Sequence, residues 1–227
     1  MHSQQHTRLI ITEDGSHSLY VPHLDENYHS THGAILESLH VYINAGLNAC
    51  KLQHVNILEI GFGTGLNAFL TLIESKKSNK QIHYYSIELY PLDIRNVKQL
   101  NYAEQLTEAN GAEHFLAMHK ATWDKTVRIS QTFSLHKIKA DFSTSNNIET
   151  NAFFDVIYFD AFAPEKQPEM WTQQIFNKLF SLCNKNAIIT TYCAKGVVRR
   201  MLQSAGFTVE RLPGPPGKRE ILRGKRM

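Results

Sequence analysis

The sequence has few cysteines, no long apolar run and no secretory signal, and each absence argues against a class of protein. Only three cysteines occur in 227 residues, Cys50, Cys183 and Cys193, and none forms a CxxC pair. An odd number of distant cysteines predicts neither a disulfide framework nor a zinc site, so we interpret them as reduced thiols. No stretch of about 18 uninterrupted apolar residues is present, which argues against a membrane-spanning helix. The N-terminus lacks the basic and apolar order of a secretory signal, so we expect a cytoplasmic protein.

Acidic residues are scarce at the C-terminal end of the chain. From Lys195 onward there are nine Lys or Arg against two Glu, a net charge of +7, whereas the preceding residues sum to −4. A basic region of this kind predicts a polyanionic partner such as nucleic acid. A solvated charged helix followed by a charged tail is the alternative, and charge alone does not decide between them.

Apolar runs and turn signals alternate along most of the chain. They predict strands at 8–21 (a hairpin around Asp14-Gly15), 55–60, 82–88, 132–140, 153–160, 187–194, 207–212 and 218–224, and helices within 23–50, 66–76, 91–106, 168–182 and 196–207. Helix and loop cannot be separated over 107–131. The alternation predicts an α/β fold with a mostly parallel, seven-stranded, doubly wound sheet and a terminal antiparallel strand. We expect this domain at 51–227, preceded by a hairpin and helix extension at 1–50.

Three glycines lie between the first buried strand and the helix that follows it. The segment LEIGFGTGLNAF contains Gly61, Gly63 and Gly65, where the missing Cβ atoms allow a sharp turn and a close ligand. The spacing is G-x-G-x-G and no GK[ST] follows, so a P-loop is excluded. A compact glycine loop preceded by Glu59 suits S-adenosylmethionine (SAM), which has no pyrophosphate. A glycine turn that serves packing only is the alternative for the loop taken alone.

Acids follow three successive strands of the predicted sheet. Glu88 ends the second strand, where a carboxylate can accept both ribose hydroxyls. Asp141 follows the third strand and precedes Phe142, so a carboxylate can accept from an adenine amino group while a ring covers the base. Asp160 ends the fourth. Because ligands of open α/β sheets bind at the carboxyl ends of the strands, we expect these side chains to line one site.

Asp160 ends an apolar run and is followed by Ala-Phe-Ala-Pro. We expect its strand to lie beside the first, next to a bound sulfonium, where the carboxylate can orient an amine for in-line displacement. An unperturbed Asp titrates about six units below an alkyl amine, a gap of roughly 8 kcal/mol. We therefore assign Asp160 to orientation and electrostatics, with the proton lost to water or through a relay. An aspartate that only caps a helix is the alternative.

Several segments together resemble a known family. ILEIGFGTGLNA, YFDAFAPEKQPEMW, TYCAKGVVRRMLQSAGF and PGPPGKRE are similar to the tRNA 5-methylaminomethyl-2-thiouridine methyltransferase family. That family comprises the methyltransferase half of MnmC and the stand-alone MnmD enzymes. Residues 25–47 (DENYHSTHGAILESLHVYINAGL) resemble its N-terminal signature, so the likeness covers nearly the whole chain. The DAFAP stretch is much more specific than the glycine loop, which many methyltransferases share.

The resemblance implies a Rossmann-like class I SAM-dependent methyltransferase. It implies that one methyl group goes to the primary amine of 5-aminomethyl-2-thiouridine at the tRNA wobble position, with Asp160 as the catalytic acid and the basic region as an RNA surface. The implied SAM-binding residues are Tyr28, Glu59, Gly61, Gly63, Gly65, Asn67, Glu88, Asp141, Phe142 and Asp160. The implied substrate-side residues are Glu37, Phe162, Tyr192, Lys195, Arg199 and Arg219, and His40 also falls in the N-terminal signature.

The chain departs from the family at two points. Gln167 stands where the family usually has an asparagine, and we expect little effect. Because the chain stops at residue 227, we expect the FAD-dependent oxidoreductase half of MnmC to be absent and the aminomethyl group to be made by other enzymes. The alternatives are a spermidine-synthase-like aminopropyltransferase, another SAM-dependent amine methyltransferase, an RNA-binding module without catalysis, and a nicotinamide dehydrogenase.

Histidine is abundant, with twelve residues, and His29-x-x-His32 could indicate a metal site. No third or fourth ligand occurs at a recognisable spacing, so we interpret these histidines as loop or surface residues. We predict no metal requirement.

Overall fold

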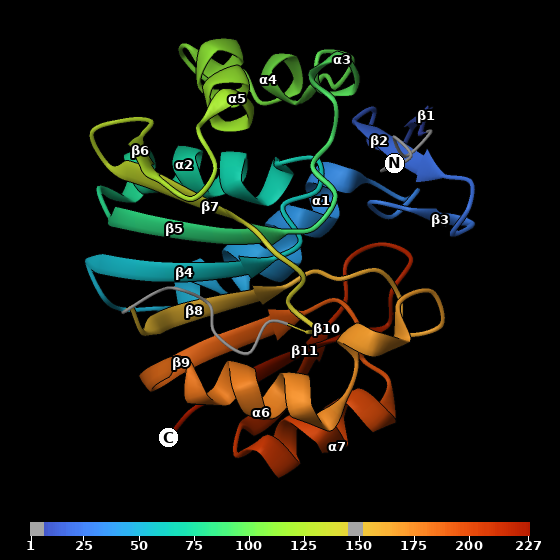
Figure 1. Cartoon of the computed structure of the whole chain (residues 1–227), viewed down its shortest axis with the longest axis vertical. Helices are drawn as coiled ribbons and strands as arrows, with labels where there is room; N and C mark the ends of the chain where they lie inside the picture. The colour runs from blue at the N-terminus through green and yellow to red at the C-terminus, as the bar shows by residue number, and fades with distance from the viewer. Residues whose placement is uncertain (1–6, 145–151) are drawn as a thin grey trace.

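The centre of the protein is an eight-stranded sheet, seen in a computed structural model that describes residues 7–144 and 152–227 (Figure 1). Its strand order is β10-β11-β9-β8-β4-β5-β7-β6. Strands β9, β8, β4, β5 and β7 are parallel, whereas β11 is antiparallel to β9, β10 to β11, and β6 to β7. The strands are β4 (His54–Ile60), β5 (Gln81–Glu88), β6 (Thr126–Arg128), β7 (Phe133–Lys139), β8 (Phe154–Phe159), β9 (Cys183–Thr191), β10 (Thr208–Pro213) and β11 (Glu220–Lys225).

Helices cover both faces of this sheet (Figure 1). One face carries α2 (Leu66–Ser78), α3 (Ile94–Val97), α4 (Tyr102–Gln105) and α5 (Gly111–Lys120), and the other carries α6 (Gln173–Ser181) and α7 (Gly196–Ala205). A short 3₁₀ turn, η3 (Pro168–Met170), precedes α6. Among the helices of the described residues, none combines the length and apolar character that crossing a bilayer requires.

The strand β4 shows how the sequence builds two hydrophobic layers. Successive side chains of a strand point to opposite faces. Val55 and Ile57 belong to the core beneath α2 and α5, while Leu58 and Ile60 belong to the core beneath α6 and α7. A strand that is buried on both faces therefore has a nearly continuous apolar sequence, which is typical of parallel sheets.

A smaller sheet lies beyond the carboxyl ends of the parallel strands (Figure 1). It contains β1 (Arg8–Ile11), β2 (His17–Val21) and β3 (Glu26–Asn27), paired antiparallel. The chain continues through α1 (Ala34–Ser38), the π-helix η1 (Leu39–Asn44) and the 3₁₀ turn η2 (Leu47–Ala49) before it enters β4. This arrangement brings the N-terminal segment to the edge where a ligand of an α/β sheet binds.

The predicted α/β fold with a mostly parallel sheet is confirmed. Some of its strands and helices differ from the predicted ones. The sheet has one strand more than predicted, because β6 forms within 107–131 and pairs with β7. The helix predicted at 91–106 is two short helices. The Asp93 carboxylate accepts a hydrogen bond from Arg95 N, which starts α3 there, and the Asn101 side chain binds Gly15 O (2.9 Å) and His17 N (2.8 Å) between the two helices. The first six residues, which belong to the N-terminus where no secretory signal was expected, lie outside the described residues.

Candidate active site

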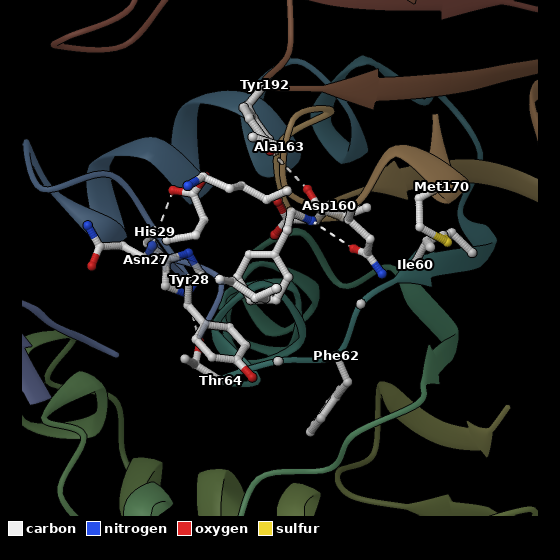
Figure 2. Close-up of a pocket in the computed structure, with 18 of the residues that line it drawn as sticks. Asn27, Tyr28, His29, Ile60, Phe62, Thr64, Asp160, Ala163, Met170 and Tyr192 are labelled. Carbon is white, nitrogen blue, oxygen red and sulfur yellow. Dashed lines mark hydrogen bonds between the residues drawn. The ribbon is translucent and has the colours of Figure 1, made fainter. Parts of the chain in front are cut away.

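A cavity of about 920 Å³ opens at the carboxyl ends of β4, β5 and β8. This volume lies near the upper end of the range for ligand pockets, which leaves room for a cofactor and part of a substrate. Figure 2 shows labelled side chains from the N-terminal segment, the glycine loop and the loop after β8 around one space. The predicted site residues that line it are Tyr28, Glu37, Gly61, Gly63, Asn67, Glu88, Asp141, Phe142, Asp160, Phe162 and Tyr192.

The glycine loop forms one wall of the cavity, and two glycines are needed for close contacts. Gly61 has φ +93, and a Cβ atom there would lie 2.8 Å from the backbone oxygen of Asp160. Gly63 has φ +48, and a Cβ atom there would lie 2.9 Å from the Tyr28 ring. Both positions favour glycine because L side chains rarely adopt such φ values. The loop can therefore bring its backbone close to a ligand.

Glu88 and Asp141 are held by backbone groups at the ends of β5 and β7. Glu88 accepts hydrogen bonds from Gly63 N (3.0 Å) and Tyr90 N (2.7 Å), and burial raises its pKa. Backbone hydrogen bonds from Leu89 and Phe62 also favour the charged form of Glu88 and lower its pKa. Burial opposes ionisation of Asp141, but hydrogen bonds from Ser143 outweigh it, and the pKa of Asp141 is lowered.

The Phe142 ring stands beside Asp141 and is buried, with the Lys178 ammonium 4.0 Å from its centroid. A buried ring next to an ionised carboxylate gives an apolar face and a hydrogen-bond acceptor in one place. This pair suits a flat base that carries an amino group.

Asp160 follows β8, which lies next to β4, as predicted. Its carboxylate receives two hydrogen bonds from protein side chains: Oδ1 from the Tyr42 hydroxyl at 2.5 Å, and Oδ2 from Asn67 Nδ2 at 2.8 Å. The two donors hold the carboxylate plane in one orientation. Each oxygen keeps a lone pair that can accept an N–H from a ligand.

Burial raises the pKa of Asp160 to about 7. The hydrogen bonds from Tyr42 and Asn67 favour the charged form, and the negative charge of Glu37 disfavours it. Part of the Asp160 surface remains open to the cavity. A carboxyl group that titrates near neutrality can hold or release a proton under ordinary conditions, which an unperturbed aspartate cannot.

The loop Ala161–Ala163 has its backbone hydrogen bonds satisfied by surrounding residues. Tyr192 donates to Ala161 O at 2.9 Å, and Trp171 Nε1 donates to Phe162 O at 2.7 Å. The Gln167 side chain accepts from Phe162 N at 3.2 Å. These hydrogen bonds hold the loop, and the Phe162 ring packs edge-on against Tyr28 with ring centroids 5.1 Å apart.

Glu59 does not line the cavity, contrary to the sequence-based expectation for a SAM-binding residue. It is fully buried in β4 and accepts a hydrogen bond from Ser86 at 2.7 Å. Alternate residues of a strand face opposite sides, so Glu59 shares the α2 side of the sheet with Val55 and Ile57. Burial raises the pKa of Glu59 well above its usual range. Gly65 also lies off the cavity, packed against His119 at the start of α2.

The predicted substrate-side cations do not all lie at one site. Lys195 and Arg219 line a shallow hollow of about 410 Å³ that shares Tyr192 with the main cavity. Arg199 lies on α7 and lines neither space, and its Nε atom is buried with no hydrogen-bond partner in the described part of the chain. His40 binds Pro213 O at 2.7 Å and is a structural contact.

The basic C-terminal region is partly neutralised within the fold. Five of its cations form ion pairs: Lys195 with Glu165, Lys218 with Glu37, Arg211 with Glu220, and Arg223 and Lys225 with Glu210. Arg226 donates to the carbonyl oxygens of Phe180 and Cys183. Over residues 7–144 and 152–227, the cations of this region outside any ion pair are Arg199, Arg200, Arg219 and Arg226. The net charge of +7 therefore overstates the free positive surface.

Sequence reasoning missed two residues that shape the site. Tyr42 occurs in an apolar helical stretch, where a tyrosine is expected to belong to the hydrophobic core. Lys218 follows a proline-rich turn, where a lysine is expected on the surface. Neither has a local signal, because each contacts a cavity residue that is remote in sequence: Tyr42 contacts Asp160, and Lys218 contacts Glu37.

The two histidines of the His29-x-x-His32 pattern have different partners. No group of three or more metal-binding side chains occurs within the described residues. His29 is buried and shares a 2.7 Å hydrogen bond with Thr64 Oγ1, and burial lowers its pKa to about 4. His32 lies 2.9 Å from Glu13 instead.

Comparisons with known sequences extend this picture. A family described as S-adenosyl-L-methionine-dependent methyltransferase matches residues 103–227, more than half of the chain. A "tRNA 5-methylaminomethyl-2-thiouridine biosynthesis bifunctional protein MnmC" of Magnetococcus marinus is 34% identical over 90% of this chain and 32% of its own length. The protein of that name from Cupriavidus necator is 35% identical over 88% of this chain and 31% of its own. The chain thus spans about a third of these relatives.

Two solved structures share the fold. A crystal structure of MnmC2 from Aquifex aeolicus has a TM-score of 0.79 at 23% identity and covers 98% of this chain and 71% of that one. Spermidine synthase from Thermotoga maritima has a TM-score of 0.54 at 10% identity, with 97% of this chain and 71% of that chain covered. At these identities the likeness concerns the fold and does not separate methyl transfer from aminopropyl transfer.

Proposed function

The chain belongs to a family of S-adenosyl-L-methionine-dependent methyltransferases, and we propose that it methylates the aminomethyl group of 5-aminomethyl-2-thiouridine at the tRNA wobble position. The product would be 5-methylaminomethyl-2-thiouridine. The observation that carries the proposal is the position of Asp160, held by Tyr42 and Asn67 beside the glycine loop. The RNA substrate is supported by the relatives, whose printed name concerns biosynthesis of this nucleoside in tRNA.

The residues present fit SAM. Gly61 and Gly63 leave room for close approach, Glu88 places a carboxylate on the cavity wall at the end of β5, and Asp141 with Phe142 offers an acceptor and an apolar face. We assign these residues to the glycine-loop, ribose and adenine contacts respectively. Tyr28 and Asn67 complete the assigned set on the cavity wall. When bound, SAM supplies a methyl group on a positively charged sulfur.

Asp160 has two tasks in the proposed reaction. Its carboxylate accepts a hydrogen bond from the acceptor amine and so directs the nitrogen lone pair toward the methyl group. At neutral pH an alkyl amine is mostly an ammonium ion without a lone pair, so it must lose a proton before its nitrogen–carbon bond can form and the sulfur–carbon bond can break. With a pKa of about 7, Asp160 lies roughly three units, or about 4 kcal/mol, below an alkyl amine. The sequence assigned Asp160 to orientation and electrostatics, and we extend that assignment by proposing that Asp160 also accepts the proton.

The base that carries the amine needs a flat apolar contact. Phe162 lies on the loop directly after Asp160 and packs edge-on against Tyr28, so both rings border the cavity. Aromatic side chains that stack on an unstacked base are a common feature of RNA recognition. We assign Phe162 and Tyr192 to contacts with the uracil ring, and Lys195, Arg199 and Arg219 to the RNA backbone.

Residues up to Cys50 form the substrate side of this arrangement in our proposal, with the SAM-binding domain at 51–227. Tyr28 and Glu37, both from this segment, line the cavity together with groups of the sheet edge. The partners of the reaction would then be tRNA and, indirectly, the enzymes that make the aminomethyl group.

One labelling experiment tests this function. The protein is incubated with methyl-labelled SAM and with tRNA that either carries 5-aminomethyl-2-thiouridine or lacks it, and nucleosides are then separated. Label in 5-methylaminomethyl-2-thiouridine from the first tRNA only is the expected result. A parallel reaction contains decarboxylated SAM and a diamine. Transfer there, with none to tRNA, would instead support an aminopropyltransferase.

A further inference from the structure

The cavity contains a second buried acid near Asp160. Glu37, from α1, has a side chain that is 9% exposed and lines the same cavity. Its Oε2 atom accepts a hydrogen bond from Ser30 N at 2.8 Å, and its Oε1 atom lies 2.9 Å from the Lys218 ammonium. Glu37 is therefore neutralised by a lysine that arrives from the opposite end of the chain.

Lys218 is held in place by more than the ion pair. Its ammonium lies 5.0 Å from the centroid of the Tyr192 ring, at a distance typical of cation–π contacts. Its backbone belongs to the turn between β10 and β11, in which Lys218 N donates to Pro215 O at 2.9 Å. The turn is also fixed against the N-terminal segment, because His40 binds Pro213 O. A cation thus occupies a defined position in the cavity wall.

Both charges of this pair act on Asp160. The negative charge of Glu37 raises the pKa of Asp160, and the positive charge of Lys218 lowers it. Each group therefore lies within electrostatic reach of the carboxylate that we assign to the acceptor amine. Within the described residues, Asp160 itself forms no ion pair. This end of the cavity holds two acids and one fixed cation.

We propose that Lys218 is a specificity-determining residue that restricts the acceptor to molecules with a single amine. By pairing with Glu37 it leaves Asp160 as the one of these two acids that is available to an ammonium group. A diamine would place its second charge against Lys218, where like charges repel in a partly desolvated site. Without the lysine, Glu37 would be a buried acid without a cation, and such a group recruits a positive ligand. The inference rests on the proposed function only for the position of the amine beside Asp160.

The same fold carries out aminopropyl transfer in spermidine synthase, according to the name of that solved structure. A fold-level likeness leaves the choice of acceptor to individual side chains. The Glu37–Lys218 pair supplies a physical reason for such a choice in this chain.

Calorimetric titration tests the proposal without RNA. The protein, saturated with S-adenosylhomocysteine, is titrated with diaminoalkanes of three to five carbons and with the monoamines of equal length. Wild type and Lys218→Arg, which keeps the charge, should show no preference for diamines. Lys218→Met should bind at least one diamine about tenfold more tightly than its monoamine, a difference of about 1.4 kcal/mol. The double variant Lys218→Met/Glu37→Gln should lose this preference.

A second variant tests the proposal even if Lys218→Met does not fold. In Glu37→Gln the lysine charge has no partner, so it should repel even one ammonium group and weaken monoamine binding about tenfold. Thermal unfolding and S-adenosylhomocysteine affinity are measured for every variant. Equal affinities for diamine and monoamine in a folded Lys218→Met variant, or unchanged monoamine binding in Glu37→Gln, would overturn the proposal. Because no tRNA is present, this result is independent of the labelling experiment.

Discussion

The Tyr42 hydroxyl donates a 2.5 Å hydrogen bond to Oδ1 of Asp160, a residue 118 positions further along the chain. Tyr42 is 1% exposed and lies in the π-helix η1, a type of turn that occurs frequently at functional sites. Burial and the nearby Asp160 raise the pKa of Tyr42 well above its usual range, so the hydroxyl stays protonated and donates. The N-terminal segment therefore helps to orient the carboxylate that ends β8.

Replacement of Asp160 by asparagine should separate binding from methyl transfer. The amide side chain would keep the shape of the carboxylate and lose its charge and its ability to accept a proton. We expect kcat to fall about 10²- to 10⁴-fold, the range for a general acid or base, while S-adenosylhomocysteine affinity changes by no more than about threefold. Single-turnover kinetics and calorimetry measure the two quantities. Full turnover in this variant would refute the role of Asp160.

The pH profile of kcat/KM should report the ionisation of Asp160 in the free enzyme. Its raised pKa of about 7 means that the carboxyl is protonated, and unable to accept from an amine, below that pH. Activity should therefore rise with pH around pH 7. If burial had no effect on the pKa of Asp160, the rise would occur at a much lower pH. Measurement of kcat/KM between pH 5 and 9, with the same acceptor amine throughout, checks the direction of this change. An Asp160→Asn variant should lack this limb.

Tyr42→Phe should move that profile to higher pH. The Tyr42 hydrogen bond favours the charged form of Asp160, so its loss raises the Asp160 pKa further. The loss of activity should accordingly be greater at pH 6 than at pH 9. Tyr158→Phe is the matched control, because Tyr158 packs 5.2 Å from the Tyr42 ring and its hydroxyl faces Thr71 instead. A Tyr42→Phe profile that coincides with wild type would remove Tyr42 from the mechanism.

Gly63→Ala should weaken SAM binding more than it weakens the fold. The residue has φ +48, and a methyl group there would lie 2.9 Å from the Tyr28 ring, so the loop or the ring must move. We expect SAM affinity to fall about tenfold, equivalent to about 1.4 kcal/mol. Gly196→Ala is the control, since its nearest atom would be the flexible end of Arg200 at 3.4 Å. That variant should bind SAM as wild type does. Equal effects from both substitutions would contradict the assignment of the loop.

Arg219→Ala should weaken tRNA binding without affecting the chemical step. Arg219 lines the hollow next to the cavity and forms no ion pair within the described residues. If it contacts a phosphate, the salt dependence of log K should become less steep by about one unit, and KM for tRNA should rise several-fold with kcat unchanged. Lys77→Ala, at the exposed C-terminal end of α2, is the matched control. An unchanged salt slope would remove Arg219 from the RNA surface.

The main strands and the ligand-binding edge could be predicted from the sequence because their signals are local. The apolar run of β4, the glycines after it and the acids after β5, β7 and β8 each occupy a few consecutive positions. Parallel topology then forces the carboxyl ends of those strands to meet, so Glu88, Asp141 and Asp160 had to line one cavity. The short edge strand β6 and the break between α3 and α4 were not predictable, because they depend on pairing with β7 and on the contacts of Asn101.

The sequence by itself determined which backbone elements form and which charged groups their ends carry, since those follow from residue order and chain geometry. Only the tertiary structure decided what those groups can do. Burial brought the pKa of Asp160 to about 7 and enclosed Glu59 outside the cavity, and the fold brought Tyr42 to Asp160 and Lys218 to Glu37 from opposite ends of the chain. Desolvation and hydrogen bonding depend on every neighbour in space, whereas a local stretch of sequence shows only the neighbours along the chain.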